Sequence, residues 1–250
     1  MGRMSGLSIH GGMGRIISKF AGMERLLPEI LFMTSNILFD LDGTLTDPKQ
    51  GITRCIQYAL SALGYPVLPE DELLWCIGPP LRGSFSRLLH STDNGLLDKA
   101  LWLYRERFAE VGLFENALIP GIPQALDSIK SLDAKIFLAT SKPLVYAVRI
   151  IGNFGLDRYF DKLYGSELDG TYSDKAELIA HILAQEAIDP ATAVMVGDRE
   201  HDVIGAARCG VKSIGVTYGY GEETELRAHG ASAIAHTPGG IASLLAELLA

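Results

Sequence analysis

Three short apolar runs, each ending in polar residues, constrain the fold of this chain more than any other feature. They are NILFD at residues 36–40, KIFLAT at 135–140 and AVMVGD at 193–198. Each is typical of a buried strand that leads into a loop. Helical patterns alternate with strand patterns from about residue 119 onward, and such alternation predicts a parallel sheet covered on both faces. We therefore expect an α/β fold with a parallel, Rossmann-like sheet.

The segment between the first and second strands has a different character. Apolar residues recur there at spacings of three and four, from about Gln50 to Leu63, and further helices are predicted near 69–76, 81–89 and 96–111. We therefore expect a helical domain over 51–118, inserted into a core made of 34–50 and 119–250. Met33 directly precedes the first convincing strand, so residues 1–33 are expected to be an extension, disordered or non-native.

Composition narrows the class of partner. The formal net charge of -8 argues against a nucleic-acid partner, because binding to a phosphate backbone needs a basic face. No apolar run reaches the roughly 18–20 residues that a membrane helix needs, so no membrane partner is expected. The three cysteines have no metal-ligand spacing, which favours a reduced, cytoplasmic setting. A small phosphorylated metabolite remains compatible, because one pocket can be locally positive.

The first strand end carries two carboxylates, Asp40 and Asp42, with one residue between them. Residues two apart at such a transition can point to the same side, so both can face one pocket. One carboxylate could attack phosphorus while the other acts as general acid and then base. Their mutual repulsion would raise one pKa toward the range suited to proton donation. A solvated turn would explain the same pair without any chemistry.

The other strand ends supply groups that phosphate chemistry needs. Thr140 and Ser141 follow the second run, where hydroxyl and N–H groups can hold phosphate oxygens, although such residues often only cap a helix. Asp198 ends the third run and could complete a magnesium site beside Asp40. Lys175 begins a predicted helix, from which an ammonium could reach the same space.

Taken together, DLDGTLTD at 40–47, Thr140, Lys175 and GDREHD at 197–202 resemble the haloacid dehalogenase-like hydrolase superfamily. They are most similar to its phosphoglycolate phosphatase branch. The resemblance runs from about Asn36 to the C-terminus. It implies a Rossmann-like core with a helical cap after the first strand, which matches the helical segment 51–118, and it implies Mg²⁺ as cofactor.

The resemblance also implies roles for the acidic residues. Asp40 would be the nucleophile and a metal ligand. Asp42 would be the general acid and base, and its main-chain carbonyl would bind the metal. Asp198 would complete the metal site, and Asp202 would orient it. An acid at position 42 favours phosphoester chemistry over dehalogenase or phosphonatase chemistry.

The remaining predicted site residues would bind phosphate or substrate. Thr140, with Ser141, would hold the transferring phosphoryl group, and Lys175 would neutralise it. Lys142 competes for this last role, but it directly follows the strand-end hydroxyls and is ranked below Lys175. Arg82, in the cap segment IGPPLRGSF, could clamp a substrate carboxylate or second phosphate, or simply be a surface residue.

These observations predict a phosphoric monoester hydrolase that acts on a small phosphate ester through a phospho-aspartyl intermediate. Three alternatives stay open. The segments DGTYSDK and GDREHDVIGA are also similar to 5'-nucleotidases that act on nucleoside monophosphates. A phosphomutase is a weaker option, because it must protect its phosphoenzyme from water. A regulatory protein that binds a phosphate ligand without turnover would be free to lose Asp40 or Asp42. We expect a monomer or a weak homodimer.

Overall fold

The computed structural model describes residues 1–2 and 35–249 of the chain. Within these residues a six-stranded sheet has the order β5-β4-β1-β6-β7-β8, and all neighbouring strands are parallel. The predicted α/β fold with a Rossmann-like sheet is therefore confirmed. The strands are β1 (Asn36–Phe39), β4 (Lys135–Pro143), β5 (Lys162–Ser166), β6 (Ala193–Gly197), β7 (Lys212–Val216) and β8 (Ala233–Ala235).

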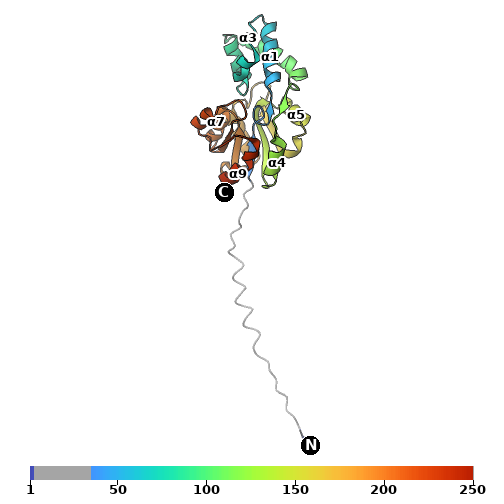
Figure 1. Ribbon diagram of the computed structural model, residues 1–250, viewed down its shortest axis with the longest axis vertical. Coiled ribbons are helices and arrows are strands. Elements are labelled where there is room, and N and C mark those ends of the chain that lie inside the picture. The colour runs from blue at the N-terminus through green and yellow to red at the C-terminus, as the bar shows by residue number, and fades with distance from the viewer. Residues whose placement is uncertain (3–34, 250) are drawn as a thin grey trace. The chain divides into compact units, whose positions relative to one another are not determined.

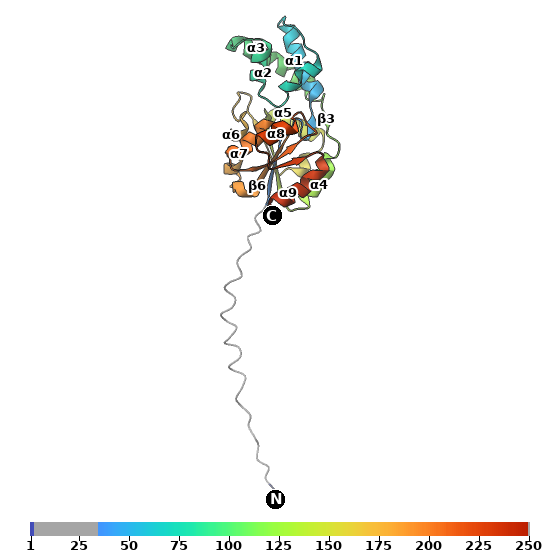
Figure 2. The same cartoon turned by 60° about the vertical axis from the view of Figure 1, so that its left-hand side comes forward.

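Alternating side chains bury both faces of this sheet. In β1, Ile37 and Phe39 pack into one apolar cluster, while Leu38 belongs to the cluster on the opposite face. Figure 2 shows the helices of the two faces on either side of the strands. The first cluster is covered by α4 (Ile122–Lys130), α5 (Leu144–Asn153) and α9 (Ile241–Leu249), and the second by α6 (Lys175–Gln185) and α7 (Glu200–Arg208).

A group of helices lies between β1 and β4 in the sequence. It is flanked by two short strands, β2 (Thr46–Asp47) and β3 (Ala117–Leu118), which pair in antiparallel fashion. This small ribbon was not predicted from the sequence. In Figures 1 and 2, α1, α2 and α3 lie together, apart from α4 and α9. The elements are α1 (Lys49–Ala62), the 3₁₀ helix η2 (Glu70–Cys76), α2 (Leu81–Leu88), α3 (Asn94–Arg107) and the π-helix η3 (Phe108–Gly112). We call residues 51–118 the cap segment.

The remaining differences from the sequence-based expectations are local. β4 continues past the predicted end at Thr140 to Pro143, with an irregularity in its pairing between Thr140 and Pro143. As expected, the helix α5 follows Pro143 and begins at Leu144. A helix after β7, α8 (Glu223–Ala228), was not predicted. Short 3₁₀ turns complete the chain: η4 (Asp157–Tyr159), η5 (Pro190–Thr192) and η6 (Pro238–Gly240).

The predicted extension over 1–33 lies outside the described residues, except for residues 1 and 2. Among the helices that the structure describes, none has the length and apolar character required to cross a membrane.

Candidate active site

The topology of the sheet brings the predicted site residues together. β1 lies between β4 and β6, with Phe39 opposite Leu138 on one side and Val196 on the other. The carboxyl ends of these three strands therefore meet at one edge, where ligands of open α/β sheets bind. The main-chain N–H of Asp40 donates to the carbonyl oxygen of Val196 at 2.9 Å, which fixes the start of the loop after β1.

A buried ion cluster forms around Lys175. Its Nζ lies 2.8 Å from Asp40 Oδ1 and 2.8 Å from Asp202 Oδ1, and it also donates to the carbonyl oxygen of Ala139 at 2.8 Å. Burial alone would lower the pKa of Lys175, but the charges of Asp202 and Asp40 outweigh burial and raise this pKa. Lys175 therefore stays cationic and holds two carboxylates at one point.

Asp198 is completely buried beside this cluster. Its Oδ2 accepts a hydrogen bond from the main-chain N–H of Tyr220 at 2.7 Å, whereas its Oδ1 is buried without a hydrogen-bond partner. Burial raises the pKa of Asp198 well above 3.8, and the nearby charges of Asp202 and Asp40 raise it further. Such a carboxylate is costly unless a cation or a proton compensates it.

Glycine permits this close packing around Asp198. Gly43 adopts a φ of 82°, in the left-handed region, and a Cβ atom at this position would lie 2.1 Å from Asp198 Oδ2. The glycine in the DLDGT motif therefore lets the loop after β1 pass directly against the carboxylate that follows β6.

Three carboxylates are arranged so that they could hold a metal ion. Asp40, Asp198 and Asp202 each offer an oxygen, and these oxygens lie within 4.8 Å of one another. The donor set is all carboxylate, which suits Mg²⁺, and the unpartnered Asp198 Oδ1 is an open ligand position. The residues present therefore fit the magnesium ion that the resemblance implies. Asp202 contributes to this group, although sequence reasoning assigned it only an orienting role.

The second carboxylate of the motif, Asp42, has a partner of its own. Its Oδ2 lies 2.9 Å from Lys142 Nζ, and both side chains are buried. Burial raises the pKa of Asp42, against the opposing effect of Lys142. The Lys142 ammonium also lies 4.6 Å from the centre of the Phe108 ring, which belongs to the cap segment. Asp42 is thus paired with a lysine that sequence reasoning ranked below Lys175, and it does not belong to the three-carboxylate group.

The irregular end of β4 explains the position of Lys142. Thr140 is buried, and its Oγ1 accepts a hydrogen bond from the main-chain N–H of Lys142 at 3.2 Å. The carbonyl oxygen of Ser141 accepts from Ser166 Oγ at 2.8 Å. These bonds hold the Thr-Ser-Lys segment at the strand end, where Ser141 and Lys142 both line a cavity.

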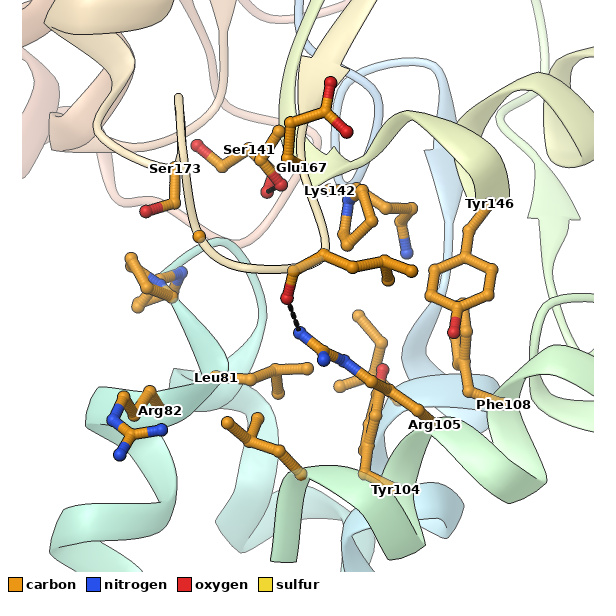
Figure 3. A pocket seen from close by; sticks show the side chains of 18 of the residues that line it. Leu81, Arg82, Tyr104, Arg105, Phe108, Ser141, Lys142, Tyr146, Glu167 and Ser173 are labelled. Atoms are coloured by element: carbon orange, nitrogen blue, oxygen red, sulfur yellow. Dashed lines mark hydrogen bonds between the residues drawn. The ribbon is translucent and has the colours of Figure 1, made fainter. Parts of the chain in front are cut away.

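That cavity, which we call the substrate pocket, has a volume of about 660 Å³ and extends between the cap segment and the strand ends. Its lining includes Asp42, so the pocket reaches one of the two carboxylates that follow β1. Figure 3 shows α2 and α3 on one side, with Tyr104, Arg105 and Phe108, and the core residues Ser141, Lys142 and Tyr146 on the other.

Arg82, predicted to contact substrate, does line the substrate pocket. Its guanidinium is engaged within the cap segment, with Nη1 2.6 Å from Asp98 Oδ1 and Nη2 2.9 Å from Asn94 Oδ1. A second arginine, Arg105, crosses the pocket and donates from Nη2 to the carbonyl oxygen of Leu168 at 2.7 Å (Figure 3). Sequence reasoning missed Arg105, because its place in a helical pattern does not reveal which loop it faces.

Another arginine links the carboxylate cluster to the cap segment. Arg199, next to Asp198, donates from Nη1 to the carbonyl oxygen of Ile77 at 3.0 Å and pairs through Nε with Glu225 at 3.1 Å. The GDREHD motif thus contacts the cap through its arginine. The sequence analysis did not single out Arg199, although its position next to the predicted metal ligand Asp198 could have indicated a role at the site.

Comparisons with known proteins identify the family to which the chain belongs. Residues 37–216 match the family of haloacid dehalogenase-like hydrolases. A 5'-nucleotidase from Pseudomonas aeruginosa is 48% identical over 194 residues, which cover 78% of this chain and 87% of that protein. A phosphoglycolate phosphatase from Vibrio parahaemolyticus is 26% identical over 85% of this chain and 93% of its own length.

Among solved structures, a protein described as a predicted phosphatase from Clostridium acetobutylicum superimposes with a TM-score of 0.82 at 39% identity. The similarity covers 86% of this chain and 99% of that one. The fold, the motif order and the family match agree, and the resemblance inferred from the sequence is confirmed. This chain belongs to the haloacid dehalogenase-like hydrolase family.

Proposed function

We propose that this protein is a magnesium-dependent phosphatase that hydrolyses small phosphate monoesters through a phospho-aspartyl intermediate on Asp40. The observation that carries the proposal is the grouping of the Asp40, Asp198 and Asp202 carboxylates, two of which pair with Lys175, next to a substrate pocket lined by Asp42. A nucleophile, a second acid, a fixed cation and a candidate metal site thus lie at one edge of the sheet.

The first half of the reaction transfers the phosphoryl group to the enzyme. Lys175 holds Asp40 through Oδ1, and the other carboxylate oxygen forms a bond to phosphorus. The bond between phosphorus and the ester oxygen breaks as Asp42 donates a proton to that oxygen, and the alcohol leaves. The raised pKa of Asp42, which results from its burial, favours the protonated form that this step requires.

In the second half, the same residues release phosphate. Asp42, now ionised, accepts a proton from a water molecule, whose oxygen attacks phosphorus while the bond to Asp40 breaks. Lys142 lies 2.9 Å from Asp42 and stabilises its ionised form. The hydroxyl and N–H groups of Thr140 and Ser141 would bind the phosphoryl oxygens during both steps.

Magnesium would be held by Asp40, Asp198 and the main-chain carbonyl of Asp42, with Asp202 in reach of the same point. When bound, it would neutralise charge on the phosphoryl oxygens. The unpartnered Asp198 Oδ1 supports this assignment, because its buried charge otherwise has no direct partner among the described residues.

Two substrate classes follow from the relatives. The 48% identical protein is named a 5'-nucleotidase, and a more distant relative is named a phosphoglycolate phosphatase. Phosphoglycolate and a nucleoside monophosphate are thus both candidates. In either case we propose a cytoplasmic enzyme that is a monomer or a weak homodimer.

The decisive experiment measures p-nitrophenyl phosphate hydrolysis with and without Mg²⁺. We expect activity that is lost in EDTA and restored by Mg²⁺, and we expect Asp40→Asn to lower kcat by on the order of 10⁴-fold. Asp127→Asn, on the exposed side of α4, is the matched control and should retain activity. Unchanged turnover by Asp40→Asn would refute the mechanism. Binding of phosphate esters without any turnover by the wild type would instead support the regulatory alternative.

A further inference from the structure

The wall of the substrate pocket is largely apolar. Leu81, Leu101 and Trp102 contribute to it from α2 and α3, and Tyr104 and Phe108 continue it toward the strand ends. The rings of Tyr104 and Phe108 stack at 5.3 Å, so they form a continuous aromatic surface. Pockets of about 300–1,000 Å³ with such linings enclose whole organic ligands. The volume of about 660 Å³ is thus far larger than a phosphate group alone requires.

The cations on this wall are already engaged. Arg82 pairs with Asp98 at 2.6 Å, and Lys142 pairs with Asp42 at 2.9 Å. Arg105 pairs with no carboxylate of the described residues, but its Nη2 is bound to a main-chain carbonyl oxygen at 2.7 Å. An anionic group on a substrate would therefore have to displace an existing partner.

Acidic residues on the same wall lack cationic partners. Glu167 and Asp169 line the pocket in the loop after β5, and neither carboxylate forms an ion pair with a described residue. Asp169 accepts hydrogen bonds from Thr171, with the main-chain N–H at 2.9 Å and the side-chain hydroxyl as a second donor. The other two acids of the lining, Asp42 and Asp98, are paired with Lys142 and Arg82, so the acids without an ion pair to a described residue are Glu167 and Asp169.

We propose that the pocket selects phosphate monoesters whose leaving group is uncharged and presents an apolar face, as a nucleoside does. Esters that carry a carboxylate or a second phosphate are discriminated against. The inference rests on the proposed phosphatase function and specifies its substrate class. The physical reason is that a second anion would lose its hydration inside the pocket without gaining a free cation.

Two matched pairs of substrates test the selectivity. Phosphoglycolate and 2-hydroxyethyl phosphate are similar in size and differ in the charge of the leaving group. Adenosine 3',5'-bisphosphate and adenosine 5'-monophosphate differ in one phosphate. In each pair we expect kcat/KM to be at least about tenfold higher for the ester with the neutral leaving group. This is the size of effect expected when one anionic group of the substrate is placed near an acidic side chain in a partly buried site, without a cation to compensate it. Equal values, or preference for the anion in either pair, would overturn the proposal.

Charge variants test the cause. Asp98→Asn releases Arg82, and Glu167→Gln removes an unpaired acid, so each should lower the neutral-to-anionic ratio of kcat/KM by at least about threefold. Asp127→Asn, outside the pocket, is the control and should leave the ratio unchanged. An unchanged ratio in both pocket variants would overturn the assignment of the selectivity to these charges.

Failure of this inference is distinguishable from failure of the proposed function. Hydrolysis of p-nitrophenyl phosphate, together with its loss in Asp40→Asn, reports on the phosphatase mechanism irrespective of the substrate pairs. A protein that passes this assay but prefers phosphoglycolate remains a phosphatase and lacks the proposed selectivity.

Discussion

Replacement of Lys175 by methionine should remove the charge that holds the site together. Lys175 Nζ lies 2.8 Å from both Asp40 Oδ1 and Asp202 Oδ1, and its side chain is 4% exposed. Methionine has a similar length but no charge. The substitution leaves Asp40 and Asp202 buried without their common cation, and breaking a buried pair in this way costs about 3–5 kcal/mol.

A loss of this size is a large part of the roughly 5–15 kcal/mol by which a domain is stable. For a protein of this length it corresponds to a fall in Tm of about 6–20 °C. The assay is urea and thermal unfolding in EDTA, repeated with Mg²⁺. We expect Mg²⁺ to recover part of the loss, because a bound dication would supply charge to the same carboxylates.

The matched control is Lys162→Met. Lys162 Nζ pairs with Glu186 at 3.0 Å, but its side chain is 53% exposed, so loss of this solvent-screened pair should cost much less than loss of the buried lysine. If Lys175→Met is no more destabilising in EDTA than Lys162→Met, then the buried cluster does not depend on its lysine and the reasoning is wrong.

Two further predictions concern Asp198. In Gly43→Ala, the new Cβ atom would lie 2.1 Å from Asp198 Oδ2, and alanine would have to adopt a φ of 82°. We therefore expect kcat with p-nitrophenyl phosphate to fall by at least about tenfold. Near-normal activity would contradict the tight packing. The pKa of Asp198 is raised by burial and by Asp202 and Asp40, so its contribution to stability is present below pH 3.8 and is lost as pH rises through the raised value. The metal-free protein should therefore lose stability as the pH rises from 3.8 through the raised pKa of Asp198, and Mg²⁺ should oppose the loss by binding the ionised carboxylates. Unfolding in EDTA that does not depend on pH above 3.8 would refute this.

The sequence by itself determined the sheet and the identity of most site residues. The runs that became β1, β4 and β6 are buried on both faces, and burial of that kind leaves a continuous apolar signal in neighbouring residues. Parallel strands bring their carboxyl ends to one edge, so Asp40, Thr140 and Asp198 could be placed together from local patterns. The assignment of Lys175 needed the family resemblance, because a lysine at a helix start is usually solvated.

Other features were decided by the tertiary structure alone. Lys142 pairs with Asp42 because an irregularity at the end of β4 directs it there, and strand patterns carry no trace of that irregularity. Asp202 joins the possible metal ligands because α7 starts beside Lys175.

The pairing of the charged side chains in the substrate pocket likewise depends on contacts between segments that are distant in the sequence. Arg82 is engaged by Asp98 across two helices, and Arg105 by Leu168 across the pocket. Apolar periodicity and turn chemistry are local properties, so a sequence displays them. The partner that a charged side chain finds is set by the folded geometry, since the free energy of an ion pair depends on distance and burial.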